Sequence, residues 1–271
     1  MSISINKNEQ CVEFLNTATG KLCGTYHYED EFKSFFRGLY TPDGKDVVAF
    51  PPPEHPHHKG LQFGLTTDLA NFWEEDEASE PNDHKLPIGK QHTARLDLLP
   101  PDDGIGFIQQ IDWLTGNVCV FNEKRMFTVA EAEGAYIWTW ETTLITTLPS
   151  VQIIKSVWDA PSTYCSPQYG YCGLGLRLVR DLFNDGKILV VPTQTKCGES
   201  PTGISFRGDG AEVTFEQNAS QGDVLFVTTY QNVWPYEGGP GFAFMGLVPT
   251  PRTIEQNNGL ELMYTITVSD V

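Results

Sequence analysis

The sequence predicts an all-β protein, folded as a single-domain antiparallel β-sandwich that takes in residues 1–271. Apolar and polar residues alternate with a period of two along most of the chain, as strands with one buried face require. Turn signals such as Asp102-Asp103-Gly104 and Gly208-Asp209-Gly210 separate these runs about every ten residues, a spacing typical of a meander or sandwich. A chain of 271 residues can bury roughly three quarters of its unfolded surface, which is enough for one sizeable core.

Two runs carry the strongest strand signal. Residues 136–148 place aromatic and β-branched side chains on alternate positions, and residues 261–268 repeat the alternation near the C-terminus. We expect Trp138 and Trp140, which share one face of the first run, to lie in the core. Shorter runs of strand character are residues 107–114, 118–129, 174–179, 188–191, 224–230 and 242–248.

The rest of the chain reads as turns and long loops. Residues 69–79 form the one candidate helix, with Asp68 as its N-cap, although their acidic run is equally typical of a loop. Residues 50–59 and 158–173 are rich in proline, histidine and tyrosine and resist assignment to strands. Long irregular segments of this kind in a sandwich are disproportionately binding loops.

The charge balance excludes some partners. The formal net charge is −17, from 18 Lys and Arg against 35 Asp and Glu, so we expect neither nucleic acid nor an anionic membrane as a partner. No apolar stretch approaches the roughly 18 residues of a membrane span, and the N-terminus lacks the apolar segment of a secretory signal. We therefore expect a cytoplasmic protein that acts on a small molecule and keeps its six cysteines as free thiols, in an oligomeric state that composition leaves open.

The most unusual stretch is residues 50–64, in which four prolines surround His55, His57 and His58. The prolines favour an extended backbone, which would project His55 and His57 to one side and His58 to the other. Imidazoles in such an arrangement can exchange protons near neutral pH or ligate a metal. A rigid loop with hydrogen-bonded histidines is the structural alternative.

A metal site lacks support from spacing. A cupin-like His-x-His site would place Glu four or five positions after the second His, where this chain has Leu61 and Gln62. We therefore expect no cofactor and no tightly bound transition metal, with a divalent metal as the alternative. Side chains that could complete a metal site only through the fold are His84, His92, Glu74 and Asp68.

Candidate residues for chemistry and binding gather around these loops. Arg177 alternates against apolar positions, so it faces away from the apolar stripe and is suited to a carboxylate or an oxyanion; pairing with one of the many acids is the alternative. The loop tryptophans could stack on a sugar or belong to the core. The candidate catalytic residues are His55, His57, His58 and Glu74, and the candidate substrate-binding residues are Arg37, Trp73, His92, Tyr171, Arg177 and Trp234.

Six short motifs together resemble one family. They are Gly38-Leu-Tyr-Thr-Pro-Asp-Gly44, Pro53-Glu-His-Pro-His-His-Lys-Gly-Leu61, Asn71-Phe-Trp73, Ile88-Gly-Lys-Gln-His92, Tyr171-Cys-Gly-Leu-Gly-Leu-Arg177 and Gly241-Phe-Ala-Phe-Met-Gly-Leu-Val248. Through them the chain resembles the domain-of-unknown-function 6807 family over most of its length, although Gln62 stands where such proteins tend to carry Trp. Members of that family often bear the name methane oxygenase PmoA, which does not fit this chain because the methane-oxidising subunit is an integral membrane protein.

The resemblance implies a soluble β-sandwich related to the galactose-mutarotase-like supersandwich, a fold that usually acts on or binds carbohydrates. Together with the histidines, it favours an enzyme that uses general acid–base chemistry on a sugar, glycoside or similar polyhydroxylated ring, through epimerisation, elimination or hydrolysis. One of His57 and His58 would face the reacting group and the other would orient the loop. The alternatives are a non-catalytic carbohydrate-binding protein and a lyase or cyclase of secondary metabolism with an aromatic-lined cavity.

Overall fold

The computed structural model describes residues 2–50, 57–75, 85–156, 172–179, 182, 203–218, 224–230 and 242–271. Within these ranges the regular structure consists almost entirely of strands, in two large antiparallel sheets and one small one. A 3-10 turn at Pro101–Asp103 connects two of the strands. The predicted all-β antiparallel sandwich is confirmed.

The first sheet has eight strands in the order β1-β2-β3-β4-β5-β11-β15-β14. Its central pairs join distant parts of the chain, because β5 pairs with β11 and β11 pairs with β15. No short turn connects these strands, so tertiary packing determines which of them pair. The strands are β1 (Ile3–Lys7), β2 (Cys11–Asn16), β3 (Leu22–His27), β4 (Phe35–Leu39), β5 (Leu61–Gly64), β11 (Gly173–Leu178), β14 (Val224–Tyr230) and β15 (Phe242–Val248).

The second sheet has seven strands in the order β12-β13-β17-β9-β8-β7-β6. Four of them, β6 to β9, follow one another as a meander of long hairpins. The strands are β6 (Lys90–Leu98), β7 (Ile105–Thr115), β8 (Val118–Ala132), β9 (Ala135–Thr146), β12 (Gly203–Gly208), β13 (Ala211–Gln217) and β17 (Leu260–Asp270). The small sheet pairs β10 (Ser150–Ile153) with β16 (Arg252–Glu255).

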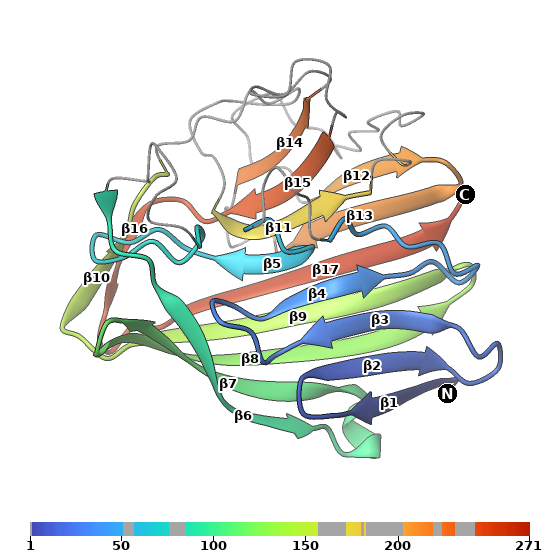
Figure 1. Ribbon diagram of the computed structural model, residues 1–271, viewed down its shortest axis with the longest axis horizontal. Coiled ribbons are helices and arrows are strands. Elements are labelled where there is room, and N and C mark those ends of the chain that lie inside the picture. The colour runs from blue at the N-terminus through green and yellow to red at the C-terminus, as the bar shows by residue number, and fades with distance from the viewer. Residues whose placement is uncertain are drawn as a thin grey trace.

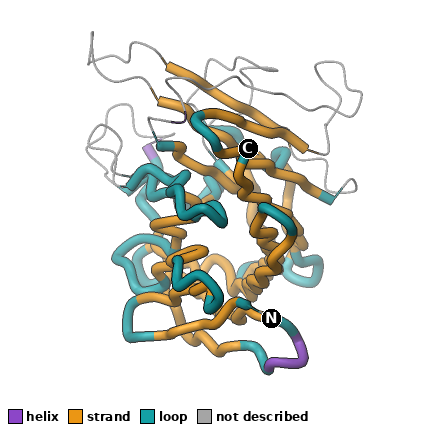
Figure 2. Tube along the Cα trace, turned by 90° about the vertical axis from the view of Figure 1, so that its right-hand side faces the viewer, coloured by secondary structure: helices purple, strands orange, loops and turns teal. Residues whose placement is uncertain are grey.

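The two large sheets face each other as two layers (Figures 1 and 2). Aromatic rings from both sheets meet between them: Phe14 of β2 lies 4.9 Å from Trp138 of β9, and Phe36 of β4 lies 4.9 Å from Phe127 of β8. Phe63 of β5 packs in the same layer, 5.9 Å from Trp140. Aromatic pairs at these separations add to the area that they bury, so this layer is the core, and it holds Trp138 and Trp140 as predicted.

An ion pair is buried inside this apolar core. The Arg125 guanidinium of β8 donates to both carboxylate oxygens of Glu123, at 2.7 and 2.9 Å. It also donates to Tyr26 Oη at 2.9 Å, and the indole nitrogen of Trp113 donates to Glu123 at 2.7 Å. We call Tyr26, Trp113, Glu123 and Arg125 the core polar cluster. Buried charges persist in a fold when they are paired and hydrogen-bonded in this way.

Most predicted strands have counterparts in the structure. Residues 136–148 correspond to β9, residues 261–268 to β17, and the shorter runs to β7, β8, β11, β14 and β15. Residues 188–191 lie outside the described residues. In the described part of the chain, no helix is long and apolar enough to cross a membrane.

The predicted helix at residues 69–79 is wrong over its described part, residues 69–75, which form bends and an isolated bridge. Side-chain oxygens accept hydrogen bonds from backbone N–H groups in this segment. The Thr67 hydroxyl accepts from residues 69 and 70, and the Asn71 amide oxygen accepts from residues 73 and 74. Thr and Asn side chains compete in this way with helical hydrogen bonds. The alternative reading as an acidic loop fits these residues.

Candidate functional site

The outer face of the first sheet, which points away from the core, carries an unusual group of buried polar side chains. Directly opposite residues of paired strands share a face, and Arg177 of β11 stands opposite Phe244 of β15. Leu174 stands opposite Phe63, whose ring lies in the core. Since side chains alternate along a strand, Arg177 lies on the outer face, where it is only 2% exposed.

Gly175 makes room for two aromatic rings on this face. A Cβ atom at Gly175 would lie 2.3 Å from Cζ of Phe244 and 2.7 Å from Cη2 of Trp73. Real Cβ atoms do not approach other atoms so closely, so the Trp73 and Phe244 rings pack directly on the glycine backbone. Their centroids are 5.9 Å apart in an edge-to-face arrangement.

His58 lies among these rings and is 1% exposed. Its ring centroid is 5.0 Å from Phe244, 6.0 Å from Trp73 and 4.6 Å from the half-buried His57. The prediction that an extended backbone would separate His57 from His58 is wrong, because residue 57 lies in a turn and the two rings meet edge to face. Both histidines therefore belong to one group, which we call the outer-face site: His57, His58, Gln62, Trp73, Glu74, Arg177 and Phe244.

The contact between His58 and Arg177 restricts the protonation of the ring. Nδ1 of His58 lies 3.5 Å from a terminal guanidinium nitrogen of Arg177. A guanidinium can only donate, so this contact is a hydrogen bond only when Nδ1 is unprotonated. A neutral ring then carries its proton on Nε2. His58 is thereby suited to donating a hydrogen bond from Nε2 and not to accepting a proton there.

Local backbone features hold the two segments that flank β5. Gly60 has a φ of +63°, and a Cβ there would lie 2.1 Å from the carbonyl oxygen of Phe36, so only glycine fits. Its carbonyl accepts a hydrogen bond from the backbone nitrogen of Arg177, which fixes the His57–Lys59 stretch to β11. On the other side of β5, the buried Asn71 side chain accepts from the backbone nitrogens of Trp73 and Glu74, at 2.8 and 3.1 Å.

Two lysines tie these segments together. Lys59 contacts the carboxylates of Asp30 and Glu75, the second at 3.0 Å, and Lys33 contacts Glu75 at 3.1 Å and donates to the carbonyl oxygen of Trp73. The Lys33 side chain has no exposed surface. Burial lowers the pKa of its ammonium, although Glu75 opposes that effect. This lysine–carboxylate cluster, Asp30, Lys33, Lys59 and Glu75, fixes residues 73–75 beside His58.

Two nitrogen atoms of the outer-face site are incompletely satisfied. The Gln62 side chain is fully buried, and its Oε1 accepts from the backbone nitrogen of Lys59 at 2.7 Å. Its Nε2 finds no hydrogen-bond partner among the described residues, and neither does Nε1 of the buried Trp73. The same holds for Nδ2 of Asn71 and for Nε1 of Trp138, which lies in the core between the sheets.

Some of the candidate catalytic and binding residues predicted from the sequence lie in the outer-face site, and others do not. The structure brings His57, His58, Trp73 and Arg177 together, with the buried Glu74 next to Trp73. Arg37 is exposed on β4 and His92 is exposed on β6 in the other sheet, so neither belongs to the buried group. His55, Tyr171 and Trp234 lie outside the described residues.

Sequence reasoning missed Gln62 as a binding candidate, as well as Phe244, Lys33 and Lys59. A fully buried glutamine in a four-residue strand has no signature in a single sequence. Among the residues that the structure describes, no group of three or more His, Cys, Asp and Glu side chains could hold a metal ion.

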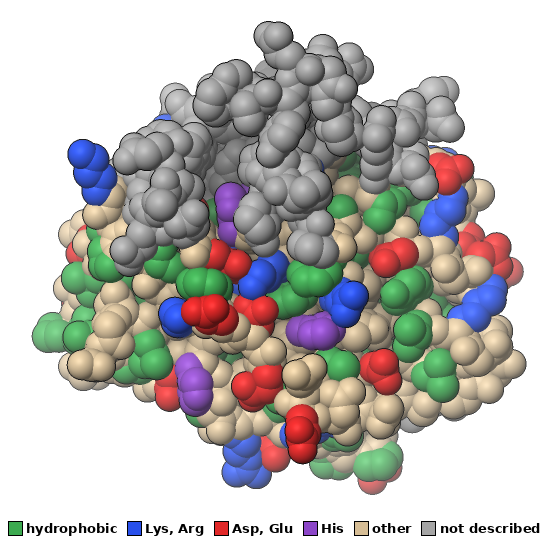
Figure 3. Space-filling model, in the orientation of Figure 1, with side chains coloured by type: hydrophobic (Ala, Val, Ile, Leu, Met, Phe, Trp, Pro, Cys, Tyr) green, Lys and Arg blue, Asp and Glu red, His purple; other side chains and the backbone are tan. Residues whose placement is uncertain are grey.

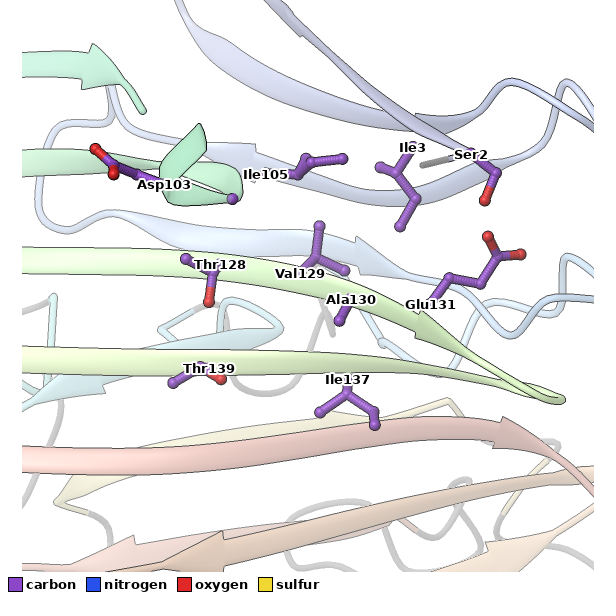
Figure 4. Close-up of a pocket in the computed structure, with 11 residues that line it drawn as sticks. Ser2, Ile3, Asp103, Ile105, Thr128, Val129, Ala130, Glu131, Ile137 and Thr139 are labelled. Atoms are coloured by element: carbon purple, nitrogen blue, oxygen red, sulfur yellow. The ribbon is translucent and has the colours of Figure 1, made fainter. Parts of the chain in front are cut away.

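A concave region is formed by other parts of the chain. It is a groove of about 440 Å³ between the N-terminus and the outer side of β8 and β9. Asp103 and Glu131 lie at its opposite ends, with apolar side chains such as Ile3 and Val129 between them (Figure 4). The described residues that line this groove include no histidine, lysine or arginine, so they offer less for proton transfer than the outer-face site.

Charged side chains elsewhere on the surface are mixed. On the face in Figure 3, acidic and basic side chains are interspersed below the residues that are not described. Several form exposed ion pairs, such as Lys90 with Glu31 at 3.0 Å. Exposed pairs of this kind contribute little to stability.

The comparisons with known proteins bear on the whole chain. A family model described as a family of unknown function, DUF6807, matches residues 15–271. The chain belongs to this family. The predicted resemblance is thereby confirmed, and the matched range includes His58, Trp73 and Arg177 of the outer-face site. No protein of curated function matches the sequence.

Solved structures align with nearly all of this chain, at low similarity. A galactose mutarotase-like protein from Clostridium acetobutylicum aligns with 99% of this chain and 98% of its own, at 8% identity and a TM-score of 0.43. A polysaccharide lyase aligns with 99% of this chain at 8% identity and a TM-score of 0.39, and the chain spans about a third, 32%, of that protein. Identities and TM-scores this low carry no activity over to this chain.

Proposed function

We propose that this DUF6807 protein is an enzyme that moves a proton on a sugar, glycoside or similar polyhydroxylated ring, with His57 as the residue that carries the proton. The observation that carries the proposal is the contact of the half-buried His57 with His58, which lies between aromatic rings and against Arg177. An imidazole titrates near neutral pH, so it can act as acid or base without a cofactor.

The two histidines have different roles in this proposal. His58 Nδ1 faces Arg177, so His58 orients the loop and donates from Nε2. His57 contacts His58 edge to face and is the more accessible of the two, so it is the histidine proposed to exchange a proton with a ligand. Glu74, a buried carboxyl next to Trp73, is the proposed second acid–base group. Epimerisation, elimination and hydrolysis all need a proton moved by a positioned acid or base, and glycoside hydrolysis commonly uses two such groups.

The chemistry of the walls favours a polyhydroxylated ring over an apolar substrate. Trp73 and Phe244 offer aromatic surface that can pack on the C–H face of a sugar. Arg177 and His58 on the same site carry polar groups suited to hydroxyl and ring oxygens. A cyclase or lyase of apolar metabolites would need a mostly apolar lining, which this mixture does not provide.

The test is a proton-transfer assay on a panel of compounds. Aldoses, methyl glycosides and uronic acids are incubated in D₂O with the protein, and ¹H NMR follows deuterium exchange, changes at the anomeric carbon and product formation. We expect turnover of at least one compound, and a loss of about 10²–10⁴-fold in rate for His57→Gln. His92→Gln is the matched control, since His92 is exposed on the other sheet, and it should keep full activity.

Two outcomes would overturn the proposal. Equal turnover by His57→Gln and wild type would remove His57 from the chemistry. Tight sugar binding that survives in His57→Gln, without turnover of any compound by wild type, would establish the alternative of a non-catalytic carbohydrate-binding protein. The proposal keeps the expectation of a cytoplasmic protein, which cell fractionation would test.

A further inference from the structure

We propose that the outer-face site recognises an acidic sugar, whose carboxylate accepts hydrogen bonds from Nε2 of Gln62 and Nε1 of Trp73. This inference rests on the proposed function and specifies its substrate class. It begins from two buried N–H groups that lack a partner among the described residues. A buried donor without a partner is costly, so such a group in a folded protein calls for a ligand or an ordered water.

The Gln62 amide is oriented so that its oxygen has a hydrogen-bond partner and its nitrogen has none among the described residues. Its Oε1 accepts from the backbone nitrogen of Lys59, which determines which end of the amide is the nitrogen. On the outer face of β5 it stands opposite Gly175, which has no side chain to cover it. Cross-strand neighbours of this kind have Cβ positions about 5 Å apart. The Trp73 ring packs on Gly175, so Gln62 and Trp73 are neighbours in the site.

Hydrogen bonds and ring contacts also fix the position of Trp73. Its backbone nitrogen donates to Asn71 and its carbonyl oxygen accepts from Lys33. Its ring contacts His58 and Phe244. The indole nitrogen can only donate, and the residue is 2% exposed, so bulk water does not satisfy it.

The two groups of this site that lack a partner among the described residues are both donors, which indicates the chemistry of the ligand. Gln62 offers an amide N–H₂ and Trp73 offers an indole N–H, and the nearby Arg177 guanidinium adds a positive charge. A carboxylate is an acceptor-only group that can fill several donors at once, and its charge suits a guanidinium. On a polyhydroxylated ring, this group is the carboxylate of a uronic acid.

The experiment compares acidic and neutral sugars of the same ring. Thermal-shift titrations of the full chain compare D-galacturonate with D-galactose and D-glucuronate with D-glucose. Within each pair the two sugars differ only at carbon 6. We expect at least one uronate to raise the melting temperature and to bind at least tenfold more tightly than its neutral counterpart. A charge-assisted hydrogen bond of ordinary strength accounts for a factor of this size.

Two conservative variants locate the binding. Trp73→Phe keeps an aromatic ring and removes the N–H, and Gln62→Glu keeps the acceptor for Lys59 and removes the N–H₂ donor. Each should weaken uronate binding about tenfold or more and should leave binding of the neutral sugars unchanged. Trp138→Phe is the matched control, because it removes the same kind of unpartnered N–H from the core between the sheets. Its melting temperature can differ, but its affinity for uronate should equal that of wild type.

The inference is overturned if neutral sugars bind as tightly as uronates, if no sugar binds, or if Trp73→Phe and Gln62→Glu keep the affinity of wild type. These failures are distinguishable from failure of the proposed function. Turnover of a neutral sugar that depends on His57 would leave the proposed function standing and remove the acidic substrate. Tight uronate binding without turnover would support the acidic ligand and remove the proposed enzymatic function.

Discussion

The molecule buries two polar clusters on the two sides of one sheet, and they differ in how completely they are satisfied. In the core polar cluster, Arg125 is held by both oxygens of Glu123, and Trp113 Nε1 donates to the same carboxylate. In the outer-face site, Trp73 Nε1 has no partner in the described part of the chain. The completed cluster lies between the two sheets and serves the fold, whereas the cluster with donors that lack a described partner lies on the outer face, where we propose that a ligand binds.

The largest loss of stability is expected when the ion pair of the core polar cluster is broken. Arg125→Met would leave Glu123 as an unpaired buried charge, which costs about 3–5 kcal/mol of unfolding free energy. For a chain of this size, that corresponds to a fall of roughly 6–20 °C in melting temperature. Chemical and thermal denaturation would measure both quantities.

The control for this prediction is Arg207→Met. Arg207 pairs with Glu212 at the surface, where ion pairs contribute about 0–1 kcal/mol. If Arg125→Met were no less stable than Arg207→Met, the core polar cluster would not be a stabilising part of the fold.

A smaller loss is expected for Lys59→Met, which opens the lysine–carboxylate cluster. Asp30 would then lose the lysine that pairs with it and Glu75 would keep only Lys33, at a cost of about 1.5–3 kcal/mol. Burial alone would raise the pKa of Asp30, but the hydrogen bond and charge of Lys59, together with hydrogen bonds from the backbone nitrogens of Phe32 and Lys33, outweigh it and hold this pKa below its ordinary 3.8. A lowered carboxyl pKa stabilises the fold above the unfolded-state pKa, and the contribution is lost as the pH falls.

The difference in stability between wild type and Lys59→Met should therefore shrink below about pH 4, as urea denaturation at several pH values would show. Lys90→Met is its control, since Lys90 pairs with Glu31 at the surface. A difference that stays constant down to pH 2 would contradict the role of Asp30.

The smallest effect, of opposite sign, is expected at Asp46. This carboxyl accepts from the backbone nitrogen of Val48, and burial raises its pKa to about 6. Between its unfolded pKa of 3.8 and about 6 the folded protein binds the extra proton, so stability falls as the pH rises through this range. Asp46→Asn should lack this fall and should be about 1–2 kcal/mol more stable than wild type at pH 7. Equal stability of the two proteins at pH 7 would contradict the raised pKa.

The sequence predicted the strands well because period-two alternation directly encodes one buried face. Residues 136–148 alternate without interruption, and β9 follows them closely. The order of the strands could not be predicted, since β5 and β11 pair across a long stretch of chain with no local signal. The extent of the domain, residues 1–271, stays a prediction.

For the candidate site, the sequence was a better guide to which residues lie together than to the backbone that carries them. His57, His58, Trp73 and Arg177 come together from three separate segments, as their unusual contexts suggested. The backbone was harder to predict, because the turn at residue 57 and the side-chain hydrogen bonds of Asn71 overrode the expected extended and helical conformations. Gln62 escaped notice because its importance comes from burial beside a glycine of another strand. The roles of these residues stay proposals.

The most direct test of the difference between the two clusters is a crystal structure of the protein soaked with D-galacturonate. We predict electron density for the sugar beside His57, with its carboxylate oxygens within about 3.2 Å of Trp73 Nε1 and Gln62 Nε2, and an unchanged core polar cluster. Density for the sugar only in the groove lined by Ile3, Val129 and Glu131, or no sugar at saturating concentration, would contradict the account.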